Sequence, residues 1–273
     1  MQKKTTGSST RVAMLVVLIV LTTVPTSRAQ STEDLAKQLA NPIASLISLP
    51  LQLNWDQNFG TEDNGEKLLL NIQPVIPFSL NTNWNLISRT IVPIVHQSDL
   101  FPGGGNQTGL GDTVQSIFFS PKKPTRSGWI WGAGPVFLLP TGTNDLLTTD
   151  RWGAGPTGVA LRQKGHWTYG ALANHLWSVA GTSARPDINS TFVQPFLSYT
   201  TSTAWTFSGN TESTYDWEAN QWSAPINLVA TKILSLGKQL VSVGGGVRYW
   251  VESPDNGPEG LGVRVIFTLL FPK

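Results

Sequence analysis

Long runs of alternating polarity are the feature of this sequence that most restricts its fold. In residues 204–217 every second position is polar, namely Thr206, Ser208, Asn210, Glu212, Thr214 and Asp216. The positions between them carry aromatic residues at both ends of the run and mostly small residues in its middle. Because successive side chains of a strand point to opposite faces, the run predicts one strand with a polar and an apolar face. It is more than twice as long as the average strand of a soluble protein, about 5–6 residues.

Similar runs follow one another from Pro50 onward and are separated by Gly, Pro, Asn and Asp. They predict strands at 49–59, 67–79, 83–97, 109–121, 128–140, 152–164, 166–180, 188–201, 204–217, 221–236, 239–252 and 259–271. Twelve is an even number, as in bacterial outer-membrane barrels, and the links after odd-numbered strands are mostly the longer ones, as outer loops are. The sequence therefore predicts an all-β fold: a transmembrane antiparallel β-barrel of about 12 strands over residues 49–273.

A soluble β-sandwich or β-rich lectin is the alternative fold, and the length of the runs argues against it. Composition also favours the barrel, since only 13% of the residues are charged, against about 25% in soluble domains. The chain has no cysteine, which excludes disulfides, CxxC zinc sites and thiol nucleophiles.

The first 29 residues have the pattern of a secretory signal peptide. Lys3, Lys4 and Arg11 precede a short apolar run at 12–21, and Ser27-Arg28-Ala29 places small residues where a signal peptidase cleaves. A transmembrane anchor is the alternative, but the run is about half of the roughly 20 residues that span a bilayer. We predict cleavage after Ala29.

Residues 30–48 have the one helix-like pattern of the mature chain. Ser31 or Thr32 is a candidate N-cap, Leu35 and Leu39 have i, i+4 spacing, and Pro42 interrupts the pattern. We predict a short periplasmic helical segment ahead of the barrel, with a plug as one role for it. A loosely ordered terminus is the alternative.

Several stretches resemble a family of bacterial outer-membrane β-barrel transporters grouped with the MetA pathway of phenol degradation, some members of which are labelled neuromedin U. The similar stretches, which spread over almost all of the mature chain, are 39–46, 71–77, 108–112, 134–142 and 152–158. The resemblance implies an outer-membrane location and the passage of small compounds, aromatic ones among them. It implies no catalytic residues, and the hormone name matches no chemistry in this sequence.

Charged residues in the predicted strands are candidates for the lining of the lumen. A charge that faces lipid at the midplane of the bilayer costs about 2–4 kcal/mol, so alternation assigns such residues to the inner face. The candidates are Arg89, Arg162, Glu212, Asp216, Arg248 and Arg264. They fit either a structural network of ion pairs that fills a narrow barrel or a lining that selects anionic or polar solutes.

Two further patterns suggest chemistry only weakly. Residues 153–158 spell GxGxxG, but they read as strand, and a dinucleotide site needs that motif between a strand and a helix. Twelve-stranded outer-membrane phospholipases use a His and a Ser two residues apart, as His96 and Ser98 are here. Alternation places both on the outer face, the flanking residues do not match that family, and Asn106 is the only conceivable third member. The three histidines also lack the spacing of a zinc site.

The sequence thus predicts a non-enzymatic channel or passive transporter for small solutes, aromatic or hydrophobic ones included, in the bacterial outer membrane. A phospholipase-like hydrolase and a structural barrel with a blocked lumen are the alternatives. The expected partners are outer-membrane lipid, the solute and the barrel assembly machinery. No metal or other cofactor is predicted. Nucleic acid is not expected either, because without the basic residues of segment 1–29 there are 15 basic against 17 acidic residues.

Overall fold

The computed structural model describes residues 31–272, so the predicted signal peptide lies outside the described residues. The described elements, in chain order, are α1 (Thr32–Leu39), β1 (Ile47–Phe59), β2 (Gly65–Ile72), β3 (Val75–Ser79), β4 (Trp84–Ser98), β5 (Asn106–Leu110), β6 (Thr113–Pro121), β7 (Trp129–Leu139), β8 (Arg151–Lys164), β9 (Trp167–Gly181), β10 (Asn189–Thr200), β11 (Trp205–Thr211), β12 (Ser213–Asp216), β13 (Gln221–Leu236), β14 (Gln239–Glu252) and β15 (Gly260–Phe271). Within residues 31–272 no helix has the length and apolar character that a membrane span needs.

The strand segments form twelve full strands, because three pairs of segments continue each other. These pairs are β2 with β3, β5 with β6, and β11 with β12. Both members of the first and third pairs lie between the same two strands, and β5 and β6 both pair with β4. Proline explains two of the interruptions, since it has no N–H to donate to the ladder. Pro74 separates β2 from β3, and the register places Glu212, between β11 and β12, opposite Pro225 of β13.

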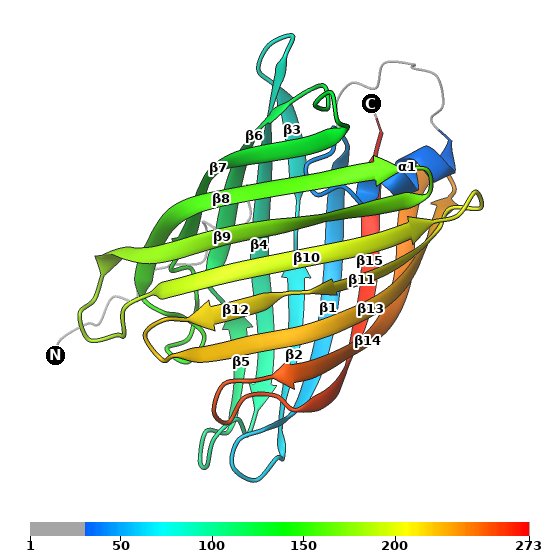
Figure 1. The fold of residues 1–273 in the computed structure, drawn as a ribbon. Coiled ribbons are helices and arrows are strands. Elements are labelled where there is room, and N and C mark those ends of the chain that lie inside the picture. The colour runs from blue at the N-terminus through cyan, green and yellow to red at the C-terminus, as the bar shows by residue number, and fades with distance from the viewer. Residues whose placement is uncertain (1–30, 273) are drawn as a thin grey trace, which may run out of the picture. The chain divides into compact units, whose positions relative to one another are not determined.

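The twelve strands close into an antiparallel barrel, as predicted (Figure 1). Each strand pairs with its neighbours in sequence, and β1 pairs with β15 from Ile47↔Phe271 to Trp55↔Val263. Closure leaves no free sheet edge, so every strand has hydrogen-bonding partners on both sides. The predicted strands agree with the observed ones to within three residues at either end.

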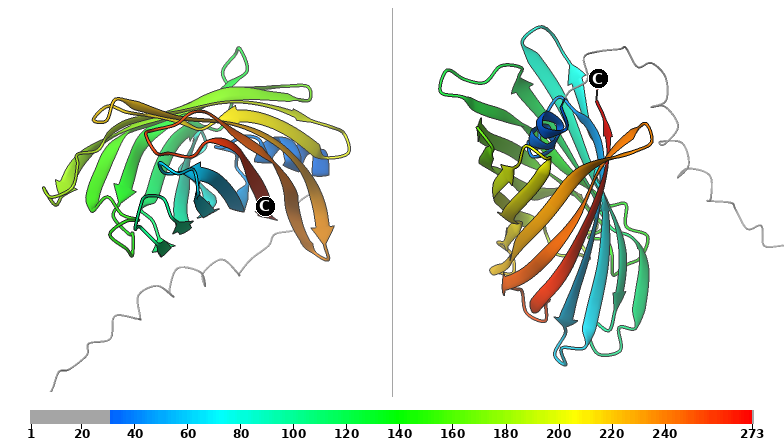
Figure 2. Two further views of the ribbon diagram at one scale, coloured as in Figure 1. Left: turned by 90° about the horizontal axis from the view of Figure 1, so that it is seen from below. Right: turned by 90° about the vertical axis from the view of Figure 1, so that its right-hand side faces the viewer.

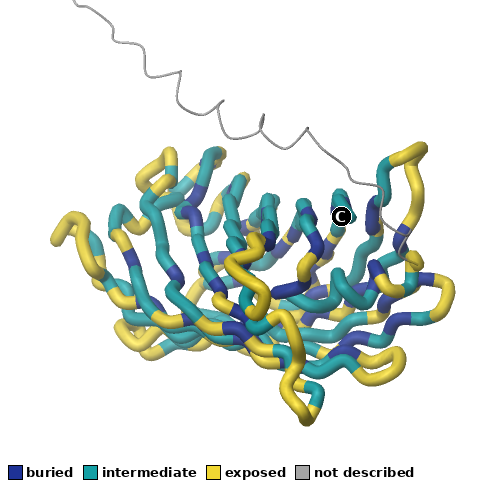
Figure 3. Tube along the Cα trace, turned by 90° about the horizontal axis from the view of Figure 1, so that it is seen from above, coloured by how far each residue is buried: buried dark blue, intermediate teal, exposed yellow. Residues whose placement is uncertain are grey.

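The two faces of the barrel wall differ in chemistry as the alternation predicts. On β15, Val263 and Val265 are 44% and 48% exposed, whereas Arg264 between them is 1% exposed. The outer face is apolar and carries many exposed tryptophans, such as Trp152 and Trp177, and the inner face buries polar side chains. In Figure 3 the exposed segments gather in the links, and buried positions recur along the strands.

The segment that precedes β1 lies inside one end of the barrel. Ser31 caps α1 by accepting a hydrogen bond from the Asp34 N–H at 3.0 Å. Leu35 and Ala36 of α1 are buried against Ile233 and Leu270 of the inner wall. Helix α1 and the C-terminal end of β15 lie at the same end of the barrel, which we call the helix end (Figure 2). We call the opposite end, where most of the longer links lie, the loop end.

Residues 31–46 cross the lumen from one wall to the other. Past α1, Ile43 is buried among Ile87, Phe118 and Leu161, which belong to β4, β6 and β8. These strands are opposite β13 and β15 in the ring of strands. The described residues 31–46 thus form an ordered segment across the helix end, which we call the plug. Whether this segment blocks the lumen stays a prediction.

Candidate functional site: the lumen

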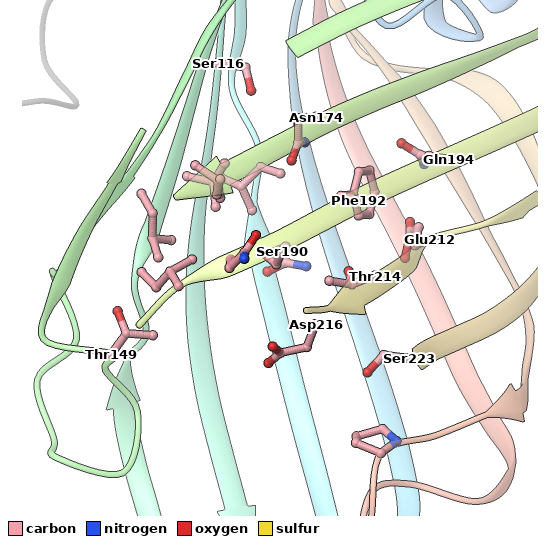
Figure 4. A pocket seen from close by; sticks show the side chains of 18 of the residues that line it. Ser116, Thr149, Asn174, Ser190, Phe192, Gln194, Glu212, Thr214, Asp216 and Ser223 are labelled. Carbon is pink, nitrogen blue, oxygen red and sulfur yellow. The ribbon is translucent and has the colours of Figure 1, made fainter. Parts of the chain in front are cut away.

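A cavity of about 740 Å³ occupies the lumen between the plug and the loop end. Part of its wall is rich in apolar side chains, namely Ile91, Val114, Leu138, Leu176 and Phe192, with Ser116 and Asn174 among them. Elsewhere the wall carries mostly amides, hydroxyls and charges, from β1, β2 and the strands from β10 onward. Figure 4 shows Gln194, Glu212, Thr214, Asp216 and Ser223 around this cavity. The arrangement suits a small solute that is apolar on one side and polar on the other.

A second, smaller cavity of about 140 Å³ lies beside the plug. It is lined by plug residues, including Leu39 and Pro42, and by Arg89 and Gln73 of the wall. Arg89 and Gln73 also line the larger cavity. These two side chains thus mark the boundary between the main cavity and the space beside the plug.

A network of ion pairs fills the lumen on one side. Both terminal nitrogens of Arg264 donate to the Glu212 carboxylate, at 3.0 and 2.6 Å, and its Nε donates to Asn54 Oδ1 at 2.7 Å. Arg248 lies 3.3 Å from Asp56 and 3.9 Å from Glu212. Its guanidinium also lies 4.6 Å from the centre of the Trp250 ring. This network joins β1, β14 and β15 to the short gap between β11 and β12.

The structure places the six candidate lining residues in three different settings. Arg89, Glu212 and Asp216 line the main cavity. Arg248 and Arg264 face inward but are buried and held by carboxylates. Whether any of them selects solutes stays a prediction.

Arg162 does not line the lumen, contrary to the prediction from the sequence. Its neighbour Leu161 is fully buried in the inner cluster, so Arg162 points to the outer face, beside its pairing partners Trp129 and Tyr169. The residue lies close to the end of β8 at Lys164. The cost of an outward charge falls to about 0–1 kcal/mol near the membrane interface, so the midplane argument does not apply there.

The loop end of the cavity is partly covered by the link between β7 and β8. Asp112 holds this link: its carboxylate accepts hydrogen bonds from the Gly142 N–H at 3.1 Å and from both the N–H and the hydroxyl of Thr149 at 2.7 Å. Two ion pairs then connect this β7–β8 link and the adjoining start of β8 to the link between β9 and β10. Arg185 lies 3.3 Å from Asp150, and Arg151 lies 3.0 Å from Asp187.

The two weak patterns in the sequence have structural explanations. Gly153, Gly155 and Gly158 lie within strand β8, and a Cβ at Gly153 would lie 3.0 Å from the Leu138 Cβ, so glycine serves close packing of the wall. His96 Nδ1 is hydrogen-bonded to the Thr108 hydroxyl at 2.6 Å. Among the described residues His96 makes no hydrogen bond to Ser98, and within residues 31–272 no group of three or more His, Cys, Asp or Glu could hold a metal ion.

Three features of the site could not be read from the sequence. The contacts of Ile43 are to strands far along the chain, so its place in the barrel is not visible in the local pattern. Asp112 follows Gly109-Leu110-Gly111, and these glycines within a strand run were a signal for a special local structure. The position of Gln73 next to Pro74 gives no hint that its side chain lies between the two cavities.

Comparison with solved structures agrees with the barrel fold. The COG4313 outer membrane channel from Pseudomonas putida F1 is similar over 83% of this chain and 96% of that chain, with a TM-score of 0.65 and 14% identity. An active-site mutant of outer membrane phospholipase A from Escherichia coli is similar over 89% of this chain and 99% of that chain, with a TM-score of 0.50 and 12% identity. At these identities the likeness establishes the fold alone. No family model and no curated protein matches the chain.

The twelve-stranded barrel, its apolar outer face and its outer-membrane neighbours point to the bacterial outer membrane as the location. Backbone groups cannot remain unpaired in lipid, and a closed barrel satisfies them all. An apolar outer face with aromatic residues and a polar inner face is the arrangement that such barrels require.

Proposed function

We propose that this protein is an outer-membrane channel for the passive movement of small solutes, and that residues 31–46 close its helix end at rest. The observation that carries the proposal is the pairing of a 740 Å³ cavity on one side of the lumen with a buried plug at its end. A barrel that served only as a structural wall would not need an internal cavity of this size. That the COG4313 protein of the same fold is a channel supports the proposal.

The mixed lining of the cavity favours solutes with an apolar body, and aromatic compounds belong to this class. Apolar side chains of β4, β6, β7 and β9 offer such a body a surface shielded from water. Small aromatic or hydrophobic compounds are therefore our proposed cargo, as the family resemblance also implies.

Displacing the plug is the test of this function. Ile43→Asp puts a carboxylate among Ile87, Phe118 and Leu161. Burying a charge in an apolar site costs several kcal/mol, and each 1.4 kcal/mol is about tenfold in an equilibrium. We expect the docked plug to become the minor state, and the conductance in planar bilayers to rise well above that of the wild-type protein.

Thr32→Asp is the matched control. It adds the same charge to the same segment at an exposed position in the first turn of α1, where an acidic side chain is favourable. The control should conduct like the wild type, and all three proteins should show the altered gel mobility of a folded barrel before heating. Equal conductance of Ile43→Asp and wild type in folded protein would contradict the plug. If neither the wild type nor Ile43→Asp conducts, a structural barrel with a blocked lumen is the better explanation.

The hydrolase alternative needs its own test, because outer membrane phospholipase A, which has a similar fold, has an active site. Phospholipid hydrolysis by purified wild-type protein that is lost in Ser98→Ala would replace the channel by an enzyme. The hydrogen bond of His96 to Thr108 rather than to Ser98 argues against that outcome.

A further inference from the structure

Arg89 differs from the other inward arginines in what its guanidinium contacts. Arg248 and Arg264 each have a carboxylate within 4.0 Å. Arg89 donates one hydrogen bond, from Nη2 to Gln73 Oε1 at 3.2 Å. No carboxylate of residues 31–272 lies within 4.0 Å of its guanidinium, and Glu212 acts on it only through a longer-range electrostatic attraction. An arginine side chain has five N–H donors, so most of those on Arg89 are available to a ligand.

The position of Arg89 is the second observation. Its side chain lines the main cavity and also the small cavity beside the plug. Arg89 and Gln73 line both cavities, so they lie where the main cavity adjoins the space beside the plug. A carboxylate bound to Arg89 would therefore lie at the plug side of the main cavity.

The wall becomes apolar beyond Ser116, the cross-strand partner of Arg89. Ile91, two residues further along β4, pairs with Val114 of β6, and Val114 pairs with Leu138 of β7. Leu176 and Ile188 extend this surface, since a Cβ at Gly153 would lie 3.4 and 3.7 Å from them. Because Gly153 has no side chain, the side chains of Leu138, Leu176 and Ile188 can pack together over its backbone.

We propose that the cavity binds monocarboxylates with an apolar body, with the carboxylate on Arg89 and the body against Ile91, Val114 and Leu138. The planar guanidinium matches a carboxylate through two parallel hydrogen bonds. A wholly apolar ligand would cover Arg89 without satisfying its donors, which is unfavourable. A second negative charge on the ligand would meet Glu212 and Asp216 across the cavity, which disfavours dianions. The inference rests on the proposed channel function and names its substrate class.

Three probes with the same ring and different head groups test the charge requirement. Benzoate, benzyl alcohol and benzylammonium are small and water-soluble, and their binding to the detergent-solubilised protein can be measured by equilibrium dialysis. We expect the wild type to prefer benzoate over both others. Arg89→Gln should weaken benzoate binding by about tenfold or more, the size of a lost charge-assisted hydrogen-bonded pair, and should leave benzyl alcohol nearly unchanged. Arg89→Lys, which keeps the charge without the planar fork, should lie between.

Arg162→Gln is the matched control, because it removes the same charge from the outer face of β8. It should bind benzoate as the wild type does. Equal binding of the three probes by the wild type, or a loss in Arg162→Gln as large as in Arg89→Gln, would overturn the proposal. If Arg89→Gln fails to fold, its gel mobility before heating shows this. Arg89→Lys then serves as the test variant, and benzoate binding as tight as that of the wild type would count against the proposal. Because binding is measured without transport, a protein that binds benzoate through Arg89 but never conducts would refute the channel and not this site.

Discussion

At the scale of single residues, Glu212 is the carboxylate that Arg248 and Arg264 share. Arg264 is almost completely buried, and Glu212 is its only ion-pair partner within residues 31–272. Arg248 shares Glu212 with Arg264 and relies otherwise on Asp56. These contacts favour a structural role for Arg248 and Arg264, since both guanidinium groups are buried beside protein carboxylates and neither residue lines the main cavity.

Removing the Glu212 charge should destabilise the barrel. Glu212→Gln leaves the Arg264 charge buried beside Asn54 with no carboxylate, and breaking a buried pair by removing one partner costs about 3–5 kcal/mol. We expect the temperature at which the folded gel band converts to the unfolded one to fall clearly. Arg162→Gln, on the outer face, should hardly move it. An unchanged conversion temperature in Glu212→Gln would mean that water in the lumen solvates Arg264.

The face of each residue can be predicted from the sequence, but its partner cannot. Alternation places Glu212 and Arg264 correctly on the inner face because a barrel wall has one inside and one outside along every strand. Their contact joins positions 52 residues apart in the chain, and it depends on the curvature and stagger of the whole barrel. Arg162 keeps the alternation, but the rule that a charge must face the lumen fails for it, because near a strand end the membrane hardly penalises an outward charge.

At the scale of elements, one side chain in the gap between β5 and β6, Asp112, makes most of the side-chain hydrogen bonds that hold the link between β7 and β8. The Asp112 carboxylate accepts four hydrogen bonds from this link, including those of Gly142 and Thr149. In addition, the Thr143 N–H donates to the Leu110 carbonyl at 3.0 Å. The link is thereby held against β5 and β6, and Thr148 and Thr149 become part of the cavity wall.

Asp112→Asn should release this link without unfolding the barrel. One oxygen is replaced by an amide nitrogen, which cannot accept from the Thr149 N–H. Hydrogen bonds to charged groups contribute about 1.5–3 kcal/mol, so cleavage of residues 141–150 by proteinase K should become about tenfold faster or more if it follows the opened population. Asp63→Asn, the same change in the link between β1 and β2, is the control and should leave this cleavage rate unaltered. If Asp112→Asn is cleaved by proteinase K as slowly as the wild type, the ion pairs of Arg185 and Arg151 are sufficient to hold the link in place.

At the scale of the whole molecule, the two ends of the barrel are unlike. The plug and most of the short turns lie at the helix end. The β7–β8 and β9–β10 links, which ion pairs join, lie at the loop end. In outer-membrane barrels the short turns face the periplasm and the longer loops face the outside. The fold therefore predicts an orientation in which the cavity opens outward and the plug stands on the periplasmic side.

The absence of cysteine from the sequence makes this orientation directly testable, because each introduced thiol is the only one. Three serines suit the purpose: Ser183 is exposed in the link between β9 and β10, Ser127 is exposed in the link between β6 and β7, and Ser223 lines the cavity. With a bulky maleimide that cannot cross the outer membrane, intact cells should label Ser183→Cys and not Ser127→Cys. Permeabilised cells should label both.

A small charged thiol reagent should reach Ser223→Cys from outside. It should react there more slowly than at Ser183→Cys, because the β7–β8 and β9–β10 links narrow the mouth of the cavity. Labelling of Ser127→Cys but not Ser183→Cys in intact cells would reverse the orientation, and with it the direction from which a solute meets the plug.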